Sequence, residues 1–163
     1  MPQFRTTRRV RHSAQDMFAL VADVERYPEF VPFCESLVVR GRRNDGDRDV
    51  LVAEMAVGYK LLRERFVSEV VLDRPAMQIR ADYLDGPFRS LENLWEFRPH
   101  PEGGSEIRFS IAYEFRSRTL ALVMGALFDR VFRTFADAFA ARADRIYGRR
   151  PAAPGSEQRP NQA

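Results

Sequence analysis

The stretch from residue 119 to residue 147 carries apolar side chains at helical spacing, and it restricts the fold more than any other segment. A helix over this range is about 40 Å long. Its apolar positions cover roughly half of a helical wheel, whereas a surface helix usually needs a stripe of about 100°. They are Leu120, Val123, Met124, Leu127, Phe128, Val131, Phe132, Phe135, Phe139, Ala143 and Ile146. So broad a face can rest on a sheet along one flank and line a pocket with the other.

Between residues 36 and 115 the chain alternates apolar and polar residues in runs that turn residues separate. The last run shows the pattern clearly, with Ile107, Phe109 and Ile111 on one face. The runs predict strands at residues 36–43, 48–58, 59–72, 77–83, 89–98 and 106–115. Strands joined by short turns favour an antiparallel meander over a parallel sheet.

The N-terminal region predicts one more strand and short helices. Residues 3–10 alternate like a strand, and Ser13 with Asp16 three residues later is typical of a helix cap. A helix is expected over residues 14–22, followed by a second short helix or turn near residues 27–33, where Pro28 and Pro32 interrupt the pattern. The chain is therefore expected to form an α+β fold, a curved antiparallel sheet of about six to seven strands closed by a long helix.

The 163 residues suit a single domain, predicted to span residues 1–148. Residues 149–163 contain three prolines and few apolar side chains, and are expected to form a disordered tail. The lone Cys34 fits a reducing compartment, and no run of about 18 apolar residues predicts a membrane span. A cytoplasmic location follows, and the net charge of +3 allows association with an anionic membrane surface.

Catalytic patterns are scarce in the sequence. Neither His12, before a helix cap, nor His100, in a proline-rich loop, is placed for a triad with Cys34 or a serine. Metal-ligand spacing and a phosphate-binding glycine loop are missing as well. The carboxylates considered for acid–base chemistry are Glu54, Glu64 and Glu69. Glu54 and Glu69 are expected to face solvent, and a non-enzymatic function is predicted.

Polar residues interrupt the faces of the sheet that should point inward. Asn93, Ser68 and Glu64 each share a strand face with apolar neighbours. Buried polar groups need hydrogen-bond partners, which a ligand or water in a cavity would supply. Pairing among the three residues is the competing explanation. A solid core is likewise the alternative to a cavity, since protein interiors are close-packed.

Arginines gather in two places, Arg40, Arg42 and Arg43 in one and Arg63 with Arg65 in the other. Acidic residues lie between them, so the simplest interpretation is a solvated face of mixed charge. The clusters lack the interleaved aromatic residues of a platform for single-stranded nucleic acid. Contact with a membrane surface or with ribosomal RNA is compatible with the charge.

Four motifs carry a resemblance to a known family, with matching order and spacing from about residue 3 to residue 148. They are the segments Val24–Cys34 (VERYPEFVPFC), Asp85–Phe97 with its Asp-Gly-Pro-Phe and Trp95, Tyr113–Phe115, and Ala138–Gly148. In these motifs the chain resembles the coenzyme Q-binding family of START-like proteins in the polyketide cyclase/dehydrase superfamily. Bacterial members are often named RatA-type ribosome-association toxins. Phe33 stands where the family often carries tryptophan, which keeps an aromatic ring at that position.

The resemblance implies a helix-grip fold, in which a bent antiparallel sheet wraps around the C-terminal helix. It also implies ubiquinone or a similar isoprenoid quinone as ligand, no catalytic cofactor, and a non-catalytic role that supports respiration. The residues suit such a ligand, because aromatic side chains can stack on its ring and Asn93 can donate a hydrogen bond to a ring carbonyl. The expected ligand-binding residues are Phe33, Phe66, Asn93, Trp95, Phe128, Phe132, Phe135 and Phe139.

Within the helix, Leu127 and Val131 are expected to anchor it to the sheet while the phenylalanines meet the quinone. Phe132→Asp is accordingly expected to abolish quinone binding without unfolding the domain. The expected partners are the quinone or another lipid and the inner membrane surface or a respiratory complex. Two alternatives stay open: a toxin that binds the large ribosomal subunit and blocks subunit association, and a polyketide cyclase or aromatase-like enzyme.

Overall fold

The computed structural model describes residues 3–59 and 62–148, except the side chains of residue 62 and residues 125–129. The tail predicted for residues 149–163 lies outside the described residues.

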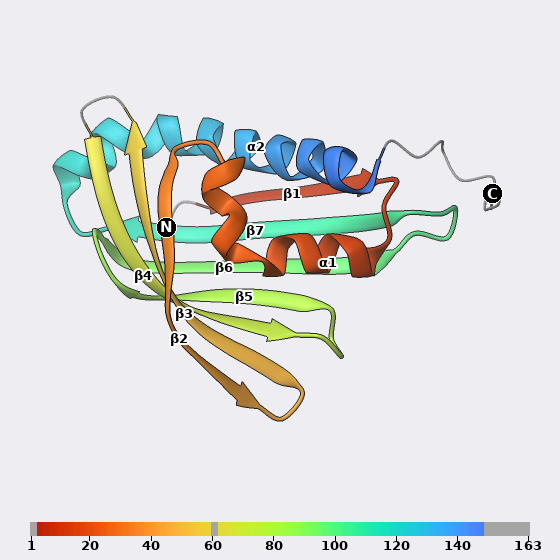
Figure 1. Ribbon diagram of the computed structural model, residues 1–163. Helices are drawn as coiled ribbons and strands as arrows, with labels where there is room; N and C mark the ends of the chain where they lie inside the picture. Colours follow the sequence, from red (N-terminus) through yellow and green to blue (C-terminus); the bar gives the residue numbers. More distant parts are fainter. Residues whose placement is uncertain (1–2, 60–61, 149–163) are drawn as a thin grey trace.

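One antiparallel sheet forms most of the domain (Figure 1). Its strands are β1 (Gln3–Val10), β2 (Cys34–Asp45), β3 (Arg48–Tyr59), β4 (Leu62–Asp73), β5 (Gln78–Asp85), β6 (Phe88–Pro99) and β7 (Ser105–Phe115). Their order across the sheet is β1-β7-β6-β5-β4-β3-β2, so the first strand of the chain pairs with the last. The other six form the expected meander, in which each hairpin joins neighbouring strands. The predicted strand number and antiparallel topology are thus confirmed.

The described residues also form three helical segments: α1 (Ala14–Ala22), the 3₁₀ helix η1 (Val24–Glu29) and α2 (Arg118–Tyr147). The predicted cap is present, because the Ser13 hydroxyl accepts a hydrogen bond of 3.0 Å from the Asp16 backbone N–H. The second helix begins at Val24, earlier than predicted, because the Asp23 carbonyl already accepts from the Arg26 N–H at 3.1 Å. A short 3₁₀ turn tolerates Pro28 near its end, so the proline does not mark its start.

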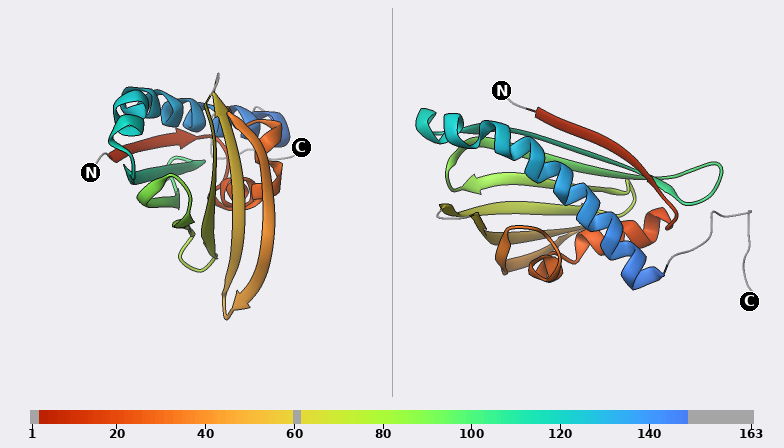
Figure 2. Two further views of the ribbon diagram at one scale, coloured as in Figure 1. Left: turned by 90° about the vertical axis from the view of Figure 1, so that its left-hand side faces the viewer. Right: turned by 90° about the horizontal axis from the view of Figure 1, so that it is seen from above.

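The long helix α2 crosses the concave side of the sheet, and the sheet bends around it (Figure 2). The Ser117 hydroxyl caps this helix by accepting from the Leu120 N–H at 3.2 Å. Among the described positions of the predicted apolar arc, two are exposed, Val123 at 66% and Ile146 at 50%. Both lie near an end of α2, where the sheet covers less of the helix. The helix-grip arrangement expected from the resemblance is therefore observed.

A cluster of ion pairs lies on the outer face of the sheet, and it shows that the predicted exposure of Glu54 was wrong. Glu54 was expected to face solvent, but it is buried, with 8% of its surface exposed. Its carboxylate pairs with Arg40 and, at 2.9 Å, with Arg65, and these exposed arginines cover it. Glu69 pairs with Arg43 at 3.4 Å and is partly exposed. The exposed arginine side chains thus shield the Glu54 carboxylate from water.

Candidate functional site

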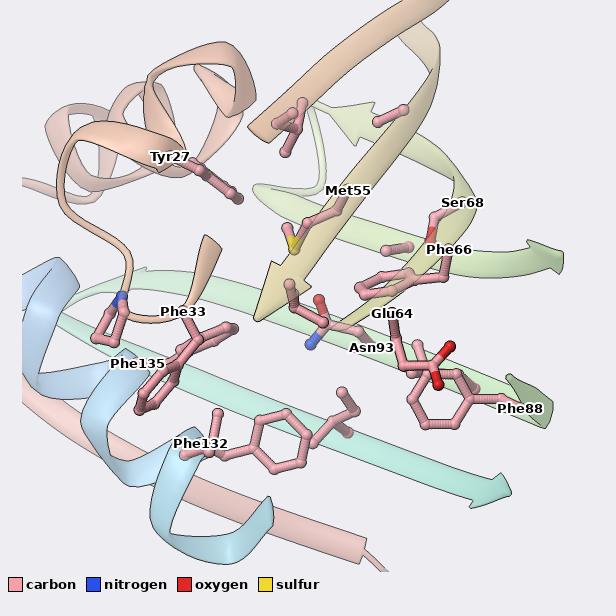
Figure 3. A pocket seen from close by; sticks show the side chains of 18 of the residues that line it. Tyr27, Phe33, Met55, Glu64, Phe66, Ser68, Phe88, Asn93, Phe132 and Phe135 are labelled. Atoms are coloured by element: carbon pink, nitrogen blue, oxygen red, sulfur yellow. The ribbon is translucent and has the colours of Figure 1, made fainter. Parts of the chain in front are cut away.

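A cavity of about 190 Å³ lies between α2 and the concave face of the sheet. Strands β2 to β7, η1 and the loop that follows it, and α2 all contribute to its wall. Most of the lining side chains are apolar, and many are aromatic. Figure 3 shows Phe33, Phe132 and Phe135 on one side of this space, opposite Phe66 and other sheet residues. The interior is therefore not a solid core, which was the alternative that the sequence left open.

The residues predicted to bind a ligand come together around this cavity. Seven of the eight line it: Phe33, Phe66, Asn93, Trp95, Phe132, Phe135 and Phe139. The side chain of the eighth, Phe128, lies outside the described residues. Contact between these side chains and a ligand stays a prediction.

The helix phenylalanines differ in how firmly they are packed. Phe132 is 5% exposed, and ring contacts with centroid distances of 5.7–6.3 Å join it to Phe4, Phe109 and Tyr113. Phe139 is 3% exposed, and its ring lies 5.0–5.2 Å from the rings of Tyr27, Phe30 and Trp95. These two side chains therefore fasten α2 to its surroundings as well as lining the cavity.

Phe135 and Val131 are only half-buried, and both line the cavity. Val131 was expected to anchor the helix, as was Leu127, whose side chain lies outside the described residues. Phe132 and Phe139, which were expected to meet the ligand, also anchor the helix, because their rings reach the facing strands and η1.

Asn93 and Trp95 form a hydrogen-bonded pair in the cavity wall. The Asn93 amide donates to the Ser110 carbonyl at 2.9 Å, and its Oδ1 accepts from the Trp95 indole N–H at 3.1 Å. These bonds fix the orientation of both side chains. The amide carries a second N–H group, so a role as donor to a ligand stays open.

Glu64 and Ser68 also line the cavity, and their situation differs from that of Asn93. Within the part of the chain that the structure describes, neither side chain has a hydrogen-bond partner in the protein. The three polar residues therefore do not pair with one another, contrary to the competing explanation from the sequence. Two polar groups are left facing an apolar space.

The segment from Val24 to Phe33 covers one side of the cavity. Tyr27 is held by its hydroxyl, which donates to the Val21 carbonyl at 2.5 Å, and burial raises the pKa of this phenol strongly. Phe33 has a positive φ of 67°, which is rare for a bulky residue, and its ring meets Tyr59 edge-on at 5.2 Å. The strained backbone turns the Phe33 ring toward the cavity.

A contact from α2 holds this segment in place. Arg142 donates to the Glu29 carboxylate at 2.8 Å, and its guanidinium lies 4.9 Å from the centre of the Phe30 ring. Hydrogen bonds from Arg26 and Arg142 lower the pKa of Glu29. The contact between Arg142 and Glu29 was not predicted from the sequence, because the two residues are 113 positions apart.

His12 is a titratable residue that lies away from the cavity wall. His12 is buried with 1% exposure, and its Nε2 lies 2.8 Å from the Asp144 carboxylate. Among the residues that the structure describes, no three histidine, cysteine or carboxylate side chains are grouped to hold a metal ion. None of the described helices is both long and apolar enough to cross a membrane.

Comparison with known proteins identifies the class. A family model described as polyketide cyclase / dehydrase and lipid transport matches residues 10–140. The chain therefore belongs to the polyketide cyclase / dehydrase and lipid transport family.

Two named relatives match most of the chain. The first is the ribosome association toxin RatA of Vibrio cholerae, 32% identical over 148 residues, which are 91% of this chain and 99% of that protein. The second is the mitochondrial coenzyme Q-binding protein COQ10 homolog B of Xenopus laevis, 36% identical over 141 residues. That match covers 84% of this chain and 56% of the relative. Both names agree with the resemblance seen in the sequence motifs.

A solved structure supports the same assignment. The solution structure of the 18 kDa protein CC1736 from Caulobacter crescentus is 33% identical, with a TM-score of 0.77. The match covers 91% of this chain and 100% of that chain. The helix-grip fold is therefore shared with a relative of appreciable sequence identity.

Proposed function

We propose that the protein binds ubiquinone or a similar isoprenoid quinone in the cavity under α2. In this proposal it acts as a non-catalytic carrier or chaperone at the inner membrane surface and supports respiratory electron transport. The observation that carries the proposal is the apolar, aromatic-lined cavity of about 190 Å³ with few polar groups. The name of the Xenopus laevis relative, a coenzyme Q-binding protein, supports it.

The chemistry of the wall suits such a ligand. A quinone ring can stack on the exposed faces of Phe33 and Phe135, and each Å² of isoprenoid surface buried contributes about 25 cal/mol. The cavity is smaller than the roughly 300–1,000 Å³ of common ligand pockets. It therefore holds the ring and the start of the tail, and the rest of a long tail extends outside.

Titration with ubiquinone carrying a single isoprene unit tests the proposal. Trp95 is the single tryptophan of the chain and lies in the cavity wall, so its fluorescence reports occupancy. Phe135→Asp should abolish the saturable quenching, because a charge would face the apolar cavity. Leu122→Asp on the same helix is the matched control, since Leu122 is 86% exposed. Absence of saturable binding to the unaltered protein would refute the proposal.

A ribosome-binding function is the second candidate, and the ribosome association toxin relative favours it. The surface charge gives it less support. Five arginines of the two clusters are each paired with a carboxylate, in the pairs Arg40–Glu54, Arg42–Glu25, Arg43–Glu69, Arg63–Glu35 and Arg65–Glu54. This pairing neutralises most of the charge of these two clusters. Salt-sensitive co-sedimentation with the large ribosomal subunit would support this candidate, and its absence at low salt would exclude it.

A further inference from the structure

Glu64 places a carboxylate in the wall of an apolar cavity, and none of the residues that the structure describes donates a hydrogen bond to it. Figure 3 shows its side chain extending from β4 into the space near Phe66 and Phe88. On the outer face of the sheet, by contrast, Glu54, Glu69 and Glu35 all pair with arginines. A carboxylate that borders apolar side chains loses part of its hydration and gains no hydrogen bond from the chain in return. A ligand that fills the cavity displaces water from this half-buried carboxylate and has to supply a hydrogen-bond donor in its place.

The other polar groups of the wall do not restrict a ligand in the same way, because the Asn93 amide keeps a second N–H group that can donate. The Asn93 amide already uses one N–H on Ser110, and its oxygen accepts from Trp95. Ser68 is 7% exposed, and its hydroxyl can either donate or accept a hydrogen bond. Glu64, as a carboxylate, only accepts. A ligand group that meets Glu64 must therefore offer a hydrogen-bond donor.

This requirement separates the two redox forms of a quinone. The oxidised ring carries carbonyl and ether oxygens, which only accept, so one of them would face the Glu64 carboxylate without a proton between them. The reduced ring carries two O–H groups, and either can donate to that carboxylate. Hydrogen bonds to a charged group are stronger than neutral ones.

We propose that the cavity prefers the reduced, hydroquinone form of its ligand and that Glu64 is the residue that sets this preference, accepting a hydrogen bond from a ring hydroxyl. The inference rests on the proposed quinone-binding function and deepens it. The charge-assisted hydrogen bond corresponds to a preference of about tenfold or more. For a two-electron couple, a tenfold preference raises the midpoint potential of the bound quinone by about 30 mV.

The test is anaerobic calorimetry of ubiquinone with one isoprene unit and of its dithionite-reduced form, each titrated into the purified full chain. The unaltered protein should bind the reduced form about tenfold or more tightly than the oxidised form. Glu64→Gln should lose this preference, because the amide N–H can donate to a ring carbonyl. Glu69→Gln is the matched control on the same strand and the opposite face, and it should keep the preference. Thermal unfolding of both variants checks that they are folded.

The outcomes separate the two proposals. Binding of both forms with equal affinity, or tighter binding of the oxidised form, overturns the role of Glu64 while quinone binding stands. A preference that persists in Glu64→Gln overturns it as well. Binding of neither form to the unaltered protein overturns the proposed function and this inference with it.

Discussion

Replacing Phe132 by alanine is expected to destabilise the domain much more than replacing Phe135, although both side chains line the cavity. Phe132 is 5% exposed, and its ring contacts rings on β1 and β7. Its truncation removes aromatic contacts and enlarges the cavity, which costs about 3–5 kcal/mol in a buried site. Phe135 is half-buried, so less surface and fewer contacts are lost.

Thermal unfolding with near-ultraviolet circular dichroism measures this difference. For a domain of this size, 1 kcal/mol corresponds to a shift of about 2–4 °C in Tm, so Phe132→Ala should lower Tm by roughly 6–20 °C. Phe135→Ala should lower Tm by clearly less and weaken ligand binding instead. Equal shifts in the two variants, or a loss below about 1 kcal/mol for Phe132→Ala, would refute the packing argument. The same reasoning changes the expectation that Phe132→Asp abolishes quinone binding without unfolding the domain. This substitution would place a charge among buried rings and is now expected to destabilise the fold.

Three further outcomes are expected. Burial raises the pKa of Cys34 to about 11, so its thiol stays protonated at neutral pH, and iodoacetamide labelling should accelerate only as the pH approaches that value; rapid labelling at neutral pH would contradict this. Ser13→Ala should cost about 1 kcal/mol in chemical denaturation, because the Asp16 N–H loses its acceptor, and an unchanged midpoint would argue against the cap. Arg142→Met should speed hydrogen exchange of the Val24–Phe33 segment and leave the sheet unaffected; unchanged exchange would show that the contact with Glu29 does not hold it.

The sequence pattern predicted the parts of the fold that local periodicity controls. Alternation located the strands to within a few residues, and the Ser13 cap located the start of α1. The inward face of β4, with Glu64 and Ser68 among apolar residues, was also visible, since side chains on a strand alternate between the two faces. This alternation is why most of the cavity wall could be anticipated.

Features that depend on irregular pairing could not be anticipated in the same way. The register between β2 and β3 shifts between Val39 and Gly41, and Arg40 lies at this irregularity. Its side chain pairs with Glu54 and helps to bury it, whereas simple alternation predicted an exposed carboxylate. Gly41 is a local signal of this bulge, since an isolated glycine inside a strand is typical of one, but it does not show which way the Arg40 side chain points.

Contacts between distant parts of the chain were also missed. His12 pairs with Asp144 across 132 residues, and this pair joins the end of β1 to the last turns of α2. Polar pairs of this kind leave no periodic trace in the sequence, because only the folded topology brings the partners together.

The identity of the molecule held by the native protein tests the central claim most directly. Mass spectrometry of lipids extracted from protein purified under mild conditions from quinone-replete cells should detect an isoprenoid quinone in amounts comparable with the protein. Phe135→Asp should carry much less of it, and Leu122→Asp an unchanged amount. Native protein that carries no quinone, and that cannot be loaded with one in vitro, would contradict the account.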